Sequence, residues 1–226
     1  MFDLISRYHS QLLDAFWVTI KLTLSSALFA LILGTLVAAA RVSPIPIARW
    51  AGSAYVNIIR NTPLTLIIVF CSLGLYTTLG LRLAAKGPND LAQNNFRFAV
   101  LGLSVYTAAF VCESLRSGIN TVPLGQAEAG RSLGLTFSQN MRLVVLPQAF
   151  RAVIAPLGSV FIALTKNSTI ASAIGVGEAA LLMAEMNENE AAALQVGAIF
   201  ALGFVILTLP TGLFFGWLAK RFEVRR

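Results

Sequence analysis

Five long apolar runs, separated by shorter polar segments, dominate the chain and predict its fold. They cover residues 16–40 (interrupted only by Lys21), 61–81, 98–112, 152–165 and 191–219, and the second run is entered from about Ala54. A helix of about 20 apolar residues crosses a hydrocarbon core of roughly 30 Å. None of the runs alternates apolar and polar residues as the strands of a membrane barrel do. Because membrane-spanning backbone must be helical or closed into a barrel, we predict an all-α polytopic membrane protein with five transmembrane helices.

The composition supports a membrane protein and bears on which partners it binds. The chain has 226 residues, of which 57% are hydrophobic and 12% charged, whereas about 25% of residues are charged in soluble proteins. A net charge of +7 in a soluble protein would point to nucleic acid. Here the basic residues lie in short loops between apolar runs, where they set the orientation in the membrane. We therefore expect contact with lipid and no nucleic-acid partner.

The distribution of basic residues predicts the orientation. A cytoplasmic C-terminus places 11 of the 17 basic residues inside, as bacterial topology favours. These are Arg41, Arg49, Arg60, Arg116, Arg131, Arg142, Arg151, Lys220, Arg221, Arg225 and Arg226. The N-terminus is then outside. We expect an amphipathic lead-in at the membrane surface over 1–15, a transmembrane domain over 16–220, and a basic cytoplasmic tail over 221–226. The apolar stretch within residues 167–190 is too short to cross the membrane. We therefore expect either a half-helix packed against the bundle or an external surface helix.

Few residues in the chain could carry covalent chemistry. His9 is the only histidine, and Cys71 and Cys112 both lie in apolar runs, where cysteine behaves as a small buried hydrophobe. We expect no catalytic residue, no metal site and no cofactor. The Gly-rich phosphate-binding loop that ends in Gly-Lys-Ser/Thr is absent from the sequence, so the chain is not expected to hydrolyse ATP.

A polar insert over 117–147 separates the third and fourth runs on the predicted cytoplasmic side. Pro123 suits the first turn of a helix, and good helix formers follow up to Leu133. Gly134 stands where a left-handed residue ends a helix. Thr136 and Gln139 have capping-box spacing, so a second helix is predicted from Phe137 to Leu146, ending at Pro147. This pattern alone predicts helix, glycine turn and helix, and leaves open an ordinary amphipathic loop or a docking surface.

The insert resembles the signature of importer-type ABC transporter permeases, EAA-x3-G-x9-I-x-LP. The matching positions are Glu128, Ala129, Gly134, Leu146 and Pro147. Gly130 replaces the usual third alanine and Val144 the usual isoleucine. In that family the loop is a coupling helix seated on the ATP-hydrolysing subunit, and these positions, with Gly130, are the implied coupling residues.

The resemblance extends over roughly 16–220. RNTPL at 60–64 and the stretches ESLRSGINTVPLGQAEAGRSLGL, LPQAFRAVIAPLG and ALTKNSTIASAIGVGE resemble permeases for polar amino acids, and most closely those for glutamate uptake in actinobacteria. This implies a bacterial plasma-membrane permease with a dimer of ATP-binding subunits, a second and different permease chain, an extracytoplasmic substrate-binding protein and an amino-acid substrate. ATP would be bound by the partner subunit.

Three places are candidates for the substrate path. Glu113 is an acid within the third predicted helix, where acids are functional candidates, but Arg116 three residues on could pair with it structurally. Lys166 and Asn167 end the fourth run; a cation there would suit an acidic substrate, although lysines at helix ends commonly snorkel. Arg60, Asn61 and Thr62 precede Pro63, which either frees backbone carbonyls for polar contacts or only kinks the helix.

Two other function classes stay open. An amino-acid carrier driven by an ion gradient would need an intramembrane ion site and, in many folds, repeated halves; the sequence offers one intramembrane acid and no evident repeat. A membrane enzyme would need a nucleophile or metal cluster at membrane depth.

Gly212 and Gly216 form a GxxxG pair that could allow a second permease helix to approach.

Overall fold

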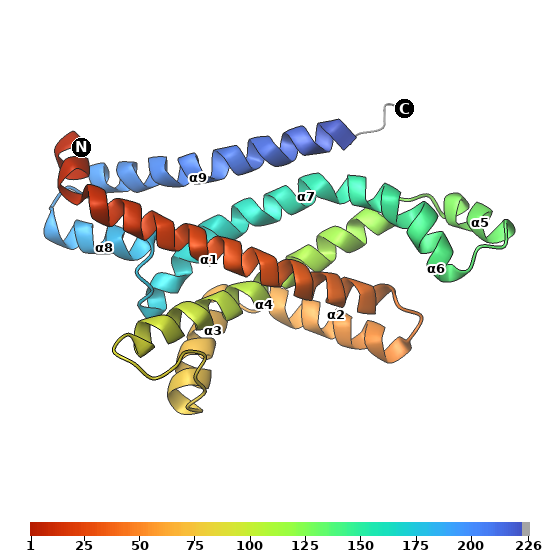
Figure 1. Ribbon diagram of the computed structural model, residues 1–226, viewed down its shortest axis with the longest axis horizontal. Helices are drawn as coiled ribbons and strands as arrows, with labels where there is room; N and C mark the ends of the chain where they lie inside the picture. Colours follow the sequence, from red (N-terminus) through yellow and green to blue (C-terminus); the bar gives the residue numbers. More distant parts are fainter. Residues whose placement is uncertain (223–226) are drawn as a thin grey trace.

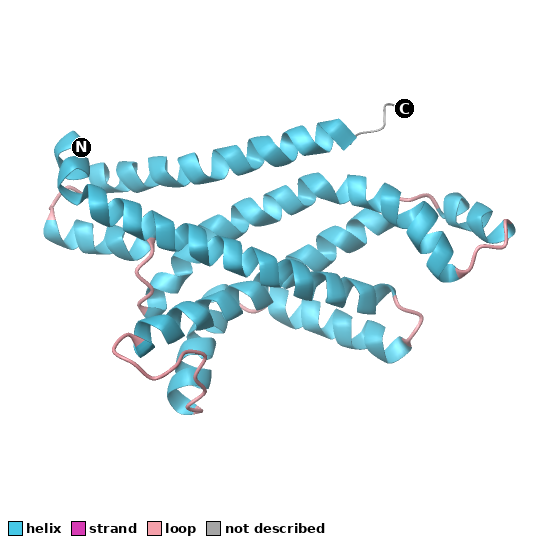
Figure 2. Cartoon of the chain, in the orientation of Figure 1, coloured by secondary structure: helices cyan, strands magenta, loops and turns pink. Residues whose placement is uncertain are grey.

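The computed structural model describes residues 1–222, and every regular element in that part of the chain is helical (Figure 2). The α-helices are α1 (Phe2–Val42), α2 (Pro46–Arg60), α3 (Leu64–Val69), α4 (Asp90–Asn120), α5 (Leu124–Ser132), α6 (Phe137–Asn140), α7 (Leu146–Asn167), α8 (Ala179–Asn189) and α9 (Ala193–Phe222). Between them lie the π-helical turns η1 (Phe70–Thr78) and η2 (Met141–Val145) and the 3₁₀-helix η3 (Ser168–Ile174). Residues 223–226 of the predicted basic tail lie outside the described residues.

The predicted membrane helices are largely confirmed. Within residues 1–222, four helical segments are long and apolar enough to cross a membrane, and a fifth exists if one bent pair is counted as a single span. The third and fourth predicted runs lie inside α4 and α7, and the fifth overlaps α9, which begins two residues later and ends three residues later than the run. The described ends of the chain lie at opposite ends of the bundle. The helices α5 and α6 lie at the end of the bundle where α9 ends (Figure 1).

The first helix is longer than predicted. The lead-in over 1–15 and the first apolar run form one continuous helix, α1, of 41 residues, or about 60 Å at 1.5 Å per residue. The N-terminal part of α1 is held by packing rather than left on a surface. Leu4, Leu12 and Ala15 are buried against a cluster from α8 and α9 that includes Met186 and Phe200.

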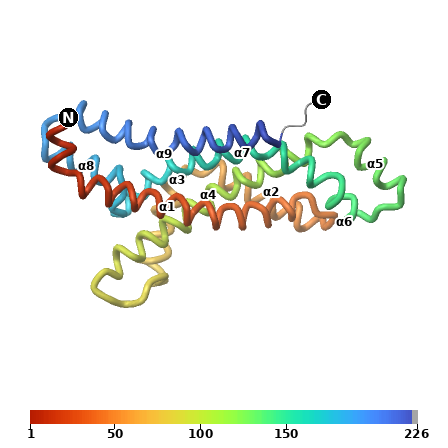
Figure 3. Tube along the Cα trace, turned by 45° about the horizontal axis from the view of Figure 1, so that its top comes forward, coloured from red at the N-terminus to blue at the C-terminus, as the bar shows by residue number. Residues whose placement is uncertain are grey.

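The second predicted helix is not one straight span. It divides into α2 and the α3–η1 segment, which meet at an angle of 103°. Pro63 is the N-cap residue directly before α3, and it has no N–H with which to continue the hydrogen bonding of the preceding helix. The second predicted span, entered from about Ala54, is therefore present as a bent pair, and Pro63, which the sequence offers as a possible kink, lies at the bend. Figure 3 shows η1 and the loop after it projecting beside the other helices.

The core is organised around α4, which packs against α1, α2 and α7. Contact between α1 and α4 depends on Gly34, because a Cβ atom there would lie 2.7 Å from Val111 and 2.8 Å from the carbonyl oxygen of Ala108. Small residues commonly allow membrane helices to approach closely. Gly158 on α7 likewise allows α9 to approach, because a Cβ atom there would lie 2.5 Å from the Cβ atom of Phe215.

Residues 167–190 take the first of the two predicted forms. After η3, α8 packs against α1 and α9 at the end of the molecule where the N-terminus lies (Figure 1). Glu178 is fully buried and its carboxylate accepts hydrogen bonds from the backbone N–H groups of Ala180 and Leu181. The segment is therefore a short helix anchored to the bundle by a buried cap.

Candidate functional site

The polar insert folds as a small helical hairpin at one end of the bundle. Its helix α5 packs against α6 and the η2 turn, and the hairpin extends beyond the membrane-spanning helices (Figure 1). The position fits a surface that another protein can reach. It also places the coupling residues predicted from the sequence at the end of the molecule where α9 finishes.

The turn between the two hairpin helices has the predicted chemistry. Gly134 adopts a left-handed conformation with φ of 80°. The N–H of Gly134 bonds to the carbonyl of Arg131, and that of Leu135 to the carbonyl of Gly130, the paired bonds of a Schellman motif. Glycine is suited to this position because a side chain would be strained at positive φ.

The second hairpin helix begins with the predicted capping box. The backbone N–H of Gln139 donates to Thr136 Oγ1 at 3.3 Å, and the N–H of Thr136 donates to Gln139 Oε1 at 2.9 Å. These two bonds satisfy N–H groups that a helix start leaves free. Local sequence chemistry therefore fixes both the turn and the entry into α6.

The predicted helix end at Pro147 is wrong. Helical backbone continues from α6 through η2 into α7, and Pro147 lies in the first turn of α7. The N–H of Leu146 bonds to the carbonyl of Met141, five residues back. Such a π-turn shifts the hydrogen-bond register, so that the proline occupies a first turn, where its missing N–H is tolerated.

Gly130 is the buried member of the coupling set. A Cβ atom on this residue would lie 2.3 Å from Oδ1 of Asn140. Asn140 is itself buried and donates from Nδ2 to the carbonyl of Ala127 at 2.7 Å, which ties α6 to α5. The departure from the family's usual alanine is therefore matched to the asparagine beneath it.

The other predicted coupling residues are exposed and lie beside exposed apolar side chains. Glu128, Ala129, Gly134, Leu146 and Pro147 are all exposed. Around them Leu133 is 83% exposed and Leu124 77%, and Phe137 is also exposed. Exposed apolar side chains of this size mark contact sites. These three are not among the residues predicted from the sequence, although apolar residues in a polar loop could have signalled them.

Glu113 has partners other than the one predicted. Its carboxylate pairs with Arg41 of α1 through Oε1 and with Arg60 of α2 through Oε2, the latter at 3.4 Å. Arg116 forms no ion pair within the described residues. The prediction of a local Glu113–Arg116 pair is therefore wrong, because the tertiary packing of α1 and α2 supplies two closer arginines.

The side chains of Asn61 and Thr62 form hydrogen bonds at the bend between α2 and α3. The Asn61 amide donates to the carbonyl of Asn57 at 2.7 Å, and the Thr62 hydroxyl donates to that of Ile58 at 2.8 Å. The Asn57 carbonyl also accepts the backbone N–H of Asn61, so the side chains add hydrogen bonds to the last turn of α2. The two side chains therefore stabilise the bend, while Arg60 beside them points to Glu113.

A cavity of about 340 Å³ lies between α4 and α7. Its wall includes Phe110 and Tyr106, whose ring centroids are 5.0 Å apart, together with Ser159, Thr107 and Asn167. The Thr107 hydroxyl is buried and has no hydrogen-bond partner within the described residues. Polar groups on a largely apolar wall are typical of small-molecule sites. Asn167 lines this cavity, whereas Lys166 is exposed and does not.

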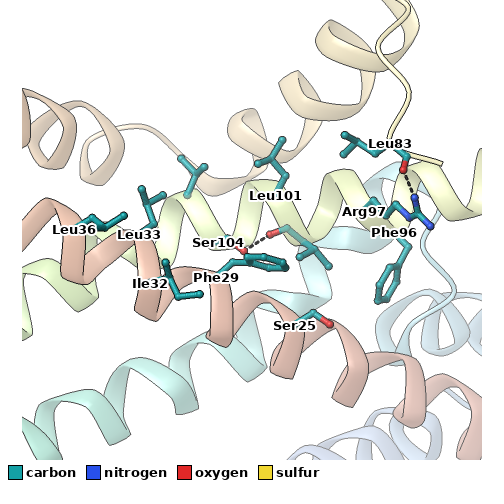
Figure 4. A pocket seen from close by; sticks show the side chains of 12 residues that line it. Ser25, Phe29, Ile32, Leu33, Leu36, Leu83, Phe96, Arg97, Leu101 and Ser104 are labelled. Carbon is teal, nitrogen blue, oxygen red and sulfur yellow. Dashed lines mark hydrogen bonds between the residues drawn. The ribbon is translucent and has the colours of Figure 1, made fainter.

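A larger cavity of about 620 Å³ lies along α1 and α4 and is almost wholly apolar (Figure 4). Phe29, Ile32 and Leu36 line it from α1. Its Ser104 hydroxyl donates to carbonyl groups of Ser26 and Val100, and Arg97 donates to the carbonyl of Leu83. This surface suits an acyl chain or a helix better than a zwitterion.

No cluster of three or more metal-ligating side chains occurs in residues 1–222.

Comparison with known proteins identifies the family. Residues 30–225 match the binding-protein-dependent transport system inner membrane component family. The chain belongs to this family. The permease is also similar to the glutamate transport system permease protein GluC of Corynebacterium efficiens, with 61% identity over 95% of each chain.

More distant relatives agree on the class. The probable glutamine ABC transporter permease protein GlnM of Bacillus subtilis is 36% identical to the permease over 99% of this chain and 96% of its own. The crystal structure of an amino acid ABC transporter with histidines superimposes with a TM-score of 0.86 at 27% identity, covering 98% of both chains. The type I ABC importer permease fold expected from the sequence is confirmed, and the chain is a permease subunit of an ABC importer.

Proposed function

We propose that this permease carries glutamate inward across the bacterial plasma membrane as one subunit of an ATP-driven importer. The substrate is inferred from the similarity to GluC, which extends over nearly the whole chain. The observation that carries the mechanism is the exposed α5–α6 hairpin, a folded docking surface on a chain whose sequence has no phosphate-binding loop.

Energy would enter through that hairpin. A separate ATP-binding subunit receives α5, with Glu128 and the apolar side chains around Gly134 at the contact. ATP binding closes the ATP-binding pair, draws two hairpins together and opens the permease outward. Hydrolysis returns it to the inward-facing state. This alternating access requires a second permease chain, which we expect to be a different one, and an extracytoplasmic binding protein that delivers the substrate.

Orientation follows from the same assignment. The hairpin must face the cytoplasm to meet an ATP-binding subunit. The end of α9 lies beside it and the N-terminus lies at the opposite end of the bundle (Figure 1). We therefore propose that the N-terminus is outside and the C-terminus is cytoplasmic.

Substrate would pass between α4 and α7. The cavity there is lined by Asn167 and by Thr107, whose hydroxyl lacks a partner within the described residues. The broken span brings Arg60 to the same region, since its guanidinium lies over the Phe110 ring. Interrupted helices commonly form binding sites in transporters because they leave polar groups at membrane depth.

A glycine substitution tests the coupling role. Gly134→Asp forces a side chain into a left-handed turn and adds a charge to the docking surface, so glutamate uptake should be abolished while the protein still inserts in the membrane. Uptake of labelled glutamate in cells that express each variant, normalised to membrane-inserted protein, measures this.

Gly80→Asp is the matched control. Gly80 also has positive φ, at 68°, and no atom lies within 4 Å of a Cβ built on it. The same backbone strain is therefore introduced outside the hairpin, and uptake should remain near the level of the unaltered protein. Normal uptake by Gly134→Asp would sink the coupling assignment.

A further inference from the structure

One carboxylate joins three helices near the break in the second span. Glu113 of α4 binds Arg41 of α1 through one oxygen and Arg60 of α2 through the other. The two arginines are held differently. The Arg41 side chain is 9% exposed, whereas that of Arg60 is 45% exposed and its nearest nitrogen is 3.4 Å from the carboxylate. Arg60 is therefore the partner that can leave.

Arg60 has a second contact, with an aromatic residue that lines the cavity between α4 and α7. Its guanidinium carbon lies 5.5 Å from the centroid of the Phe110 ring. Phe110 and Tyr106 form the aromatic wall of that cavity. The guanidinium therefore stands at one face of an aromatic residue that also borders the cavity.

The charges of the cluster do not balance. Two arginines and one glutamate give 2 − 1 = +1. An uncompensated charge that is partly removed from water costs free energy. Glutamate itself carries one net negative charge at neutral pH, since it has two carboxylates and one ammonium. A bound glutamate would therefore make the cluster neutral. The free-energy cost of removing its charge from water would then be smaller.

We propose that Arg60 exchanges Glu113 for a carboxylate of the transported amino acid. Between transport cycles Glu113 holds Arg60 at the cavity edge. When the substrate arrives, Arg60 moves to its carboxylate, and Arg41 keeps Glu113 paired so that no acid is left alone. The unpartnered Thr107 hydroxyl is a second hydrogen-bonding group for the same ligand. Glu113 is a positioning residue and Arg60 the substrate ligand. This inference rests on the proposed function.

The test uses the complete transporter, reconstituted in liposomes with its ATP-binding subunits and glutamate-loaded binding protein. Arg60→Gln removes the charge, Arg60→Lys keeps the charge without the planar fork, and Glu113→Gln removes the competing carboxylate. Arg49→Gln on the same helix is the control, because Arg49 bonds to loop carbonyls of Ser43 and Pro44. Labelled glutamate uptake and ATP hydrolysis are measured together.

The expected results differ between variants. Arg60→Gln should lower the glutamate transported per ATP by about tenfold, which corresponds to about 1.4 kcal/mol, while binding protein still stimulates hydrolysis. Arg60→Lys should be intermediate. Glu113→Gln should lower both the half-saturating concentration and the maximal rate, because the substrate is held more tightly and released more slowly.

A purely structural cluster would behave otherwise. The Arg60 and Glu113 variants would then lower thermal stability together, and glutamate transported per ATP would match that of Arg49→Gln. That result overturns the exchange. Failure of the proposed function looks different, because the unaltered transporter would then show no ATP-driven glutamate uptake at all.

Discussion

At the scale of single residues, Gly130 shows how a departure from a family pattern can be tied to a neighbour. The sequence alone treats glycine in place of alanine as a small change that keeps the fit. The structure shows that Asn140 occupies the space an alanine methyl would need and holds the carbonyl of Ala127. The space available at residue 130 is therefore limited by residue 140, which no local rule about loops could predict.

This pairing gives a prediction about stability. Gly130→Ala should destabilise the hairpin by about 1–3 kcal/mol, as overpacking does, and reduce uptake. Adding Asn140→Ala removes the obstructing amide, so the double variant should be more stable than the sum of the single changes implies. Thermal unfolding of the four proteins in detergent measures the coupling. Strict additivity would show that the two residues do not compete for space.

Glu113 makes the same point about charge. A helix-spacing rule selects Arg116, three residues away, but the observed partner Arg41 is 72 residues away in the sequence. Only the packing of α1 and α2 on α4 brings Arg41 and Arg60 to this carboxylate. Sequence reasoning identified the acid and Arg60 as separate candidates and could not join them.

At the scale of elements, the buried start of α8 has a titratable group with an unusual environment. Glu178 is fully buried, and burial raises its pKa from an ordinary 4.5 to about 7, against the opposing effect of two backbone N–H groups that stabilise the charge. The folded protein therefore keeps this proton at pH values where the unfolded chain has released it. Folding stability from this group is fully present below about 4.5 and is lost as pH rises through 7.

A pH series tests this assignment. The thermal midpoint of the unaltered protein should fall between pH 5 and pH 7.5, because the folded state must then ionise a buried carboxyl. Glu178→Gln should remove this part of the slope, since its amide oxygen can still accept a backbone hydrogen bond. Glu188→Gln on the exposed part of α8 should leave the slope unchanged. An identical slope in all three proteins contradicts the buried acid.

Element boundaries show what local patterns can and cannot give. Apolar length located α4, α7 and α9, and cap chemistry located the Gly134 turn and the start of α6. Pro147 was misread as an end because the π-turn that accommodates it depends on hydrogen-bond register rather than composition. Pro63 is a possible kink from the sequence alone, and at the 103° bend the side chains of Asn61 and Thr62 also donate to carbonyls of α2.

At the scale of the whole molecule, the chain is a helical bundle with the exposed α5–α6 hairpin at one end and the bundle-packed helix α8 at the other. The long helices α1, α4, α7 and α9 connect these ends (Figure 1). Movement of the hairpin can therefore be transmitted along rigid elements to the cavity between α4 and α7. The sequence predicted the class, the hairpin and the family, while the cavity and the arginine cluster required the fold.

The most direct measurement is glutamate uptake into liposomes that contain the assembled transporter, with and without enclosed ATP and with ion gradients controlled separately. The account predicts uptake that requires ATP and the binding protein and persists after ionophores collapse the ion gradients. Uptake that continues without ATP and follows an imposed proton or sodium gradient would show an ion-driven carrier, and would contradict the account.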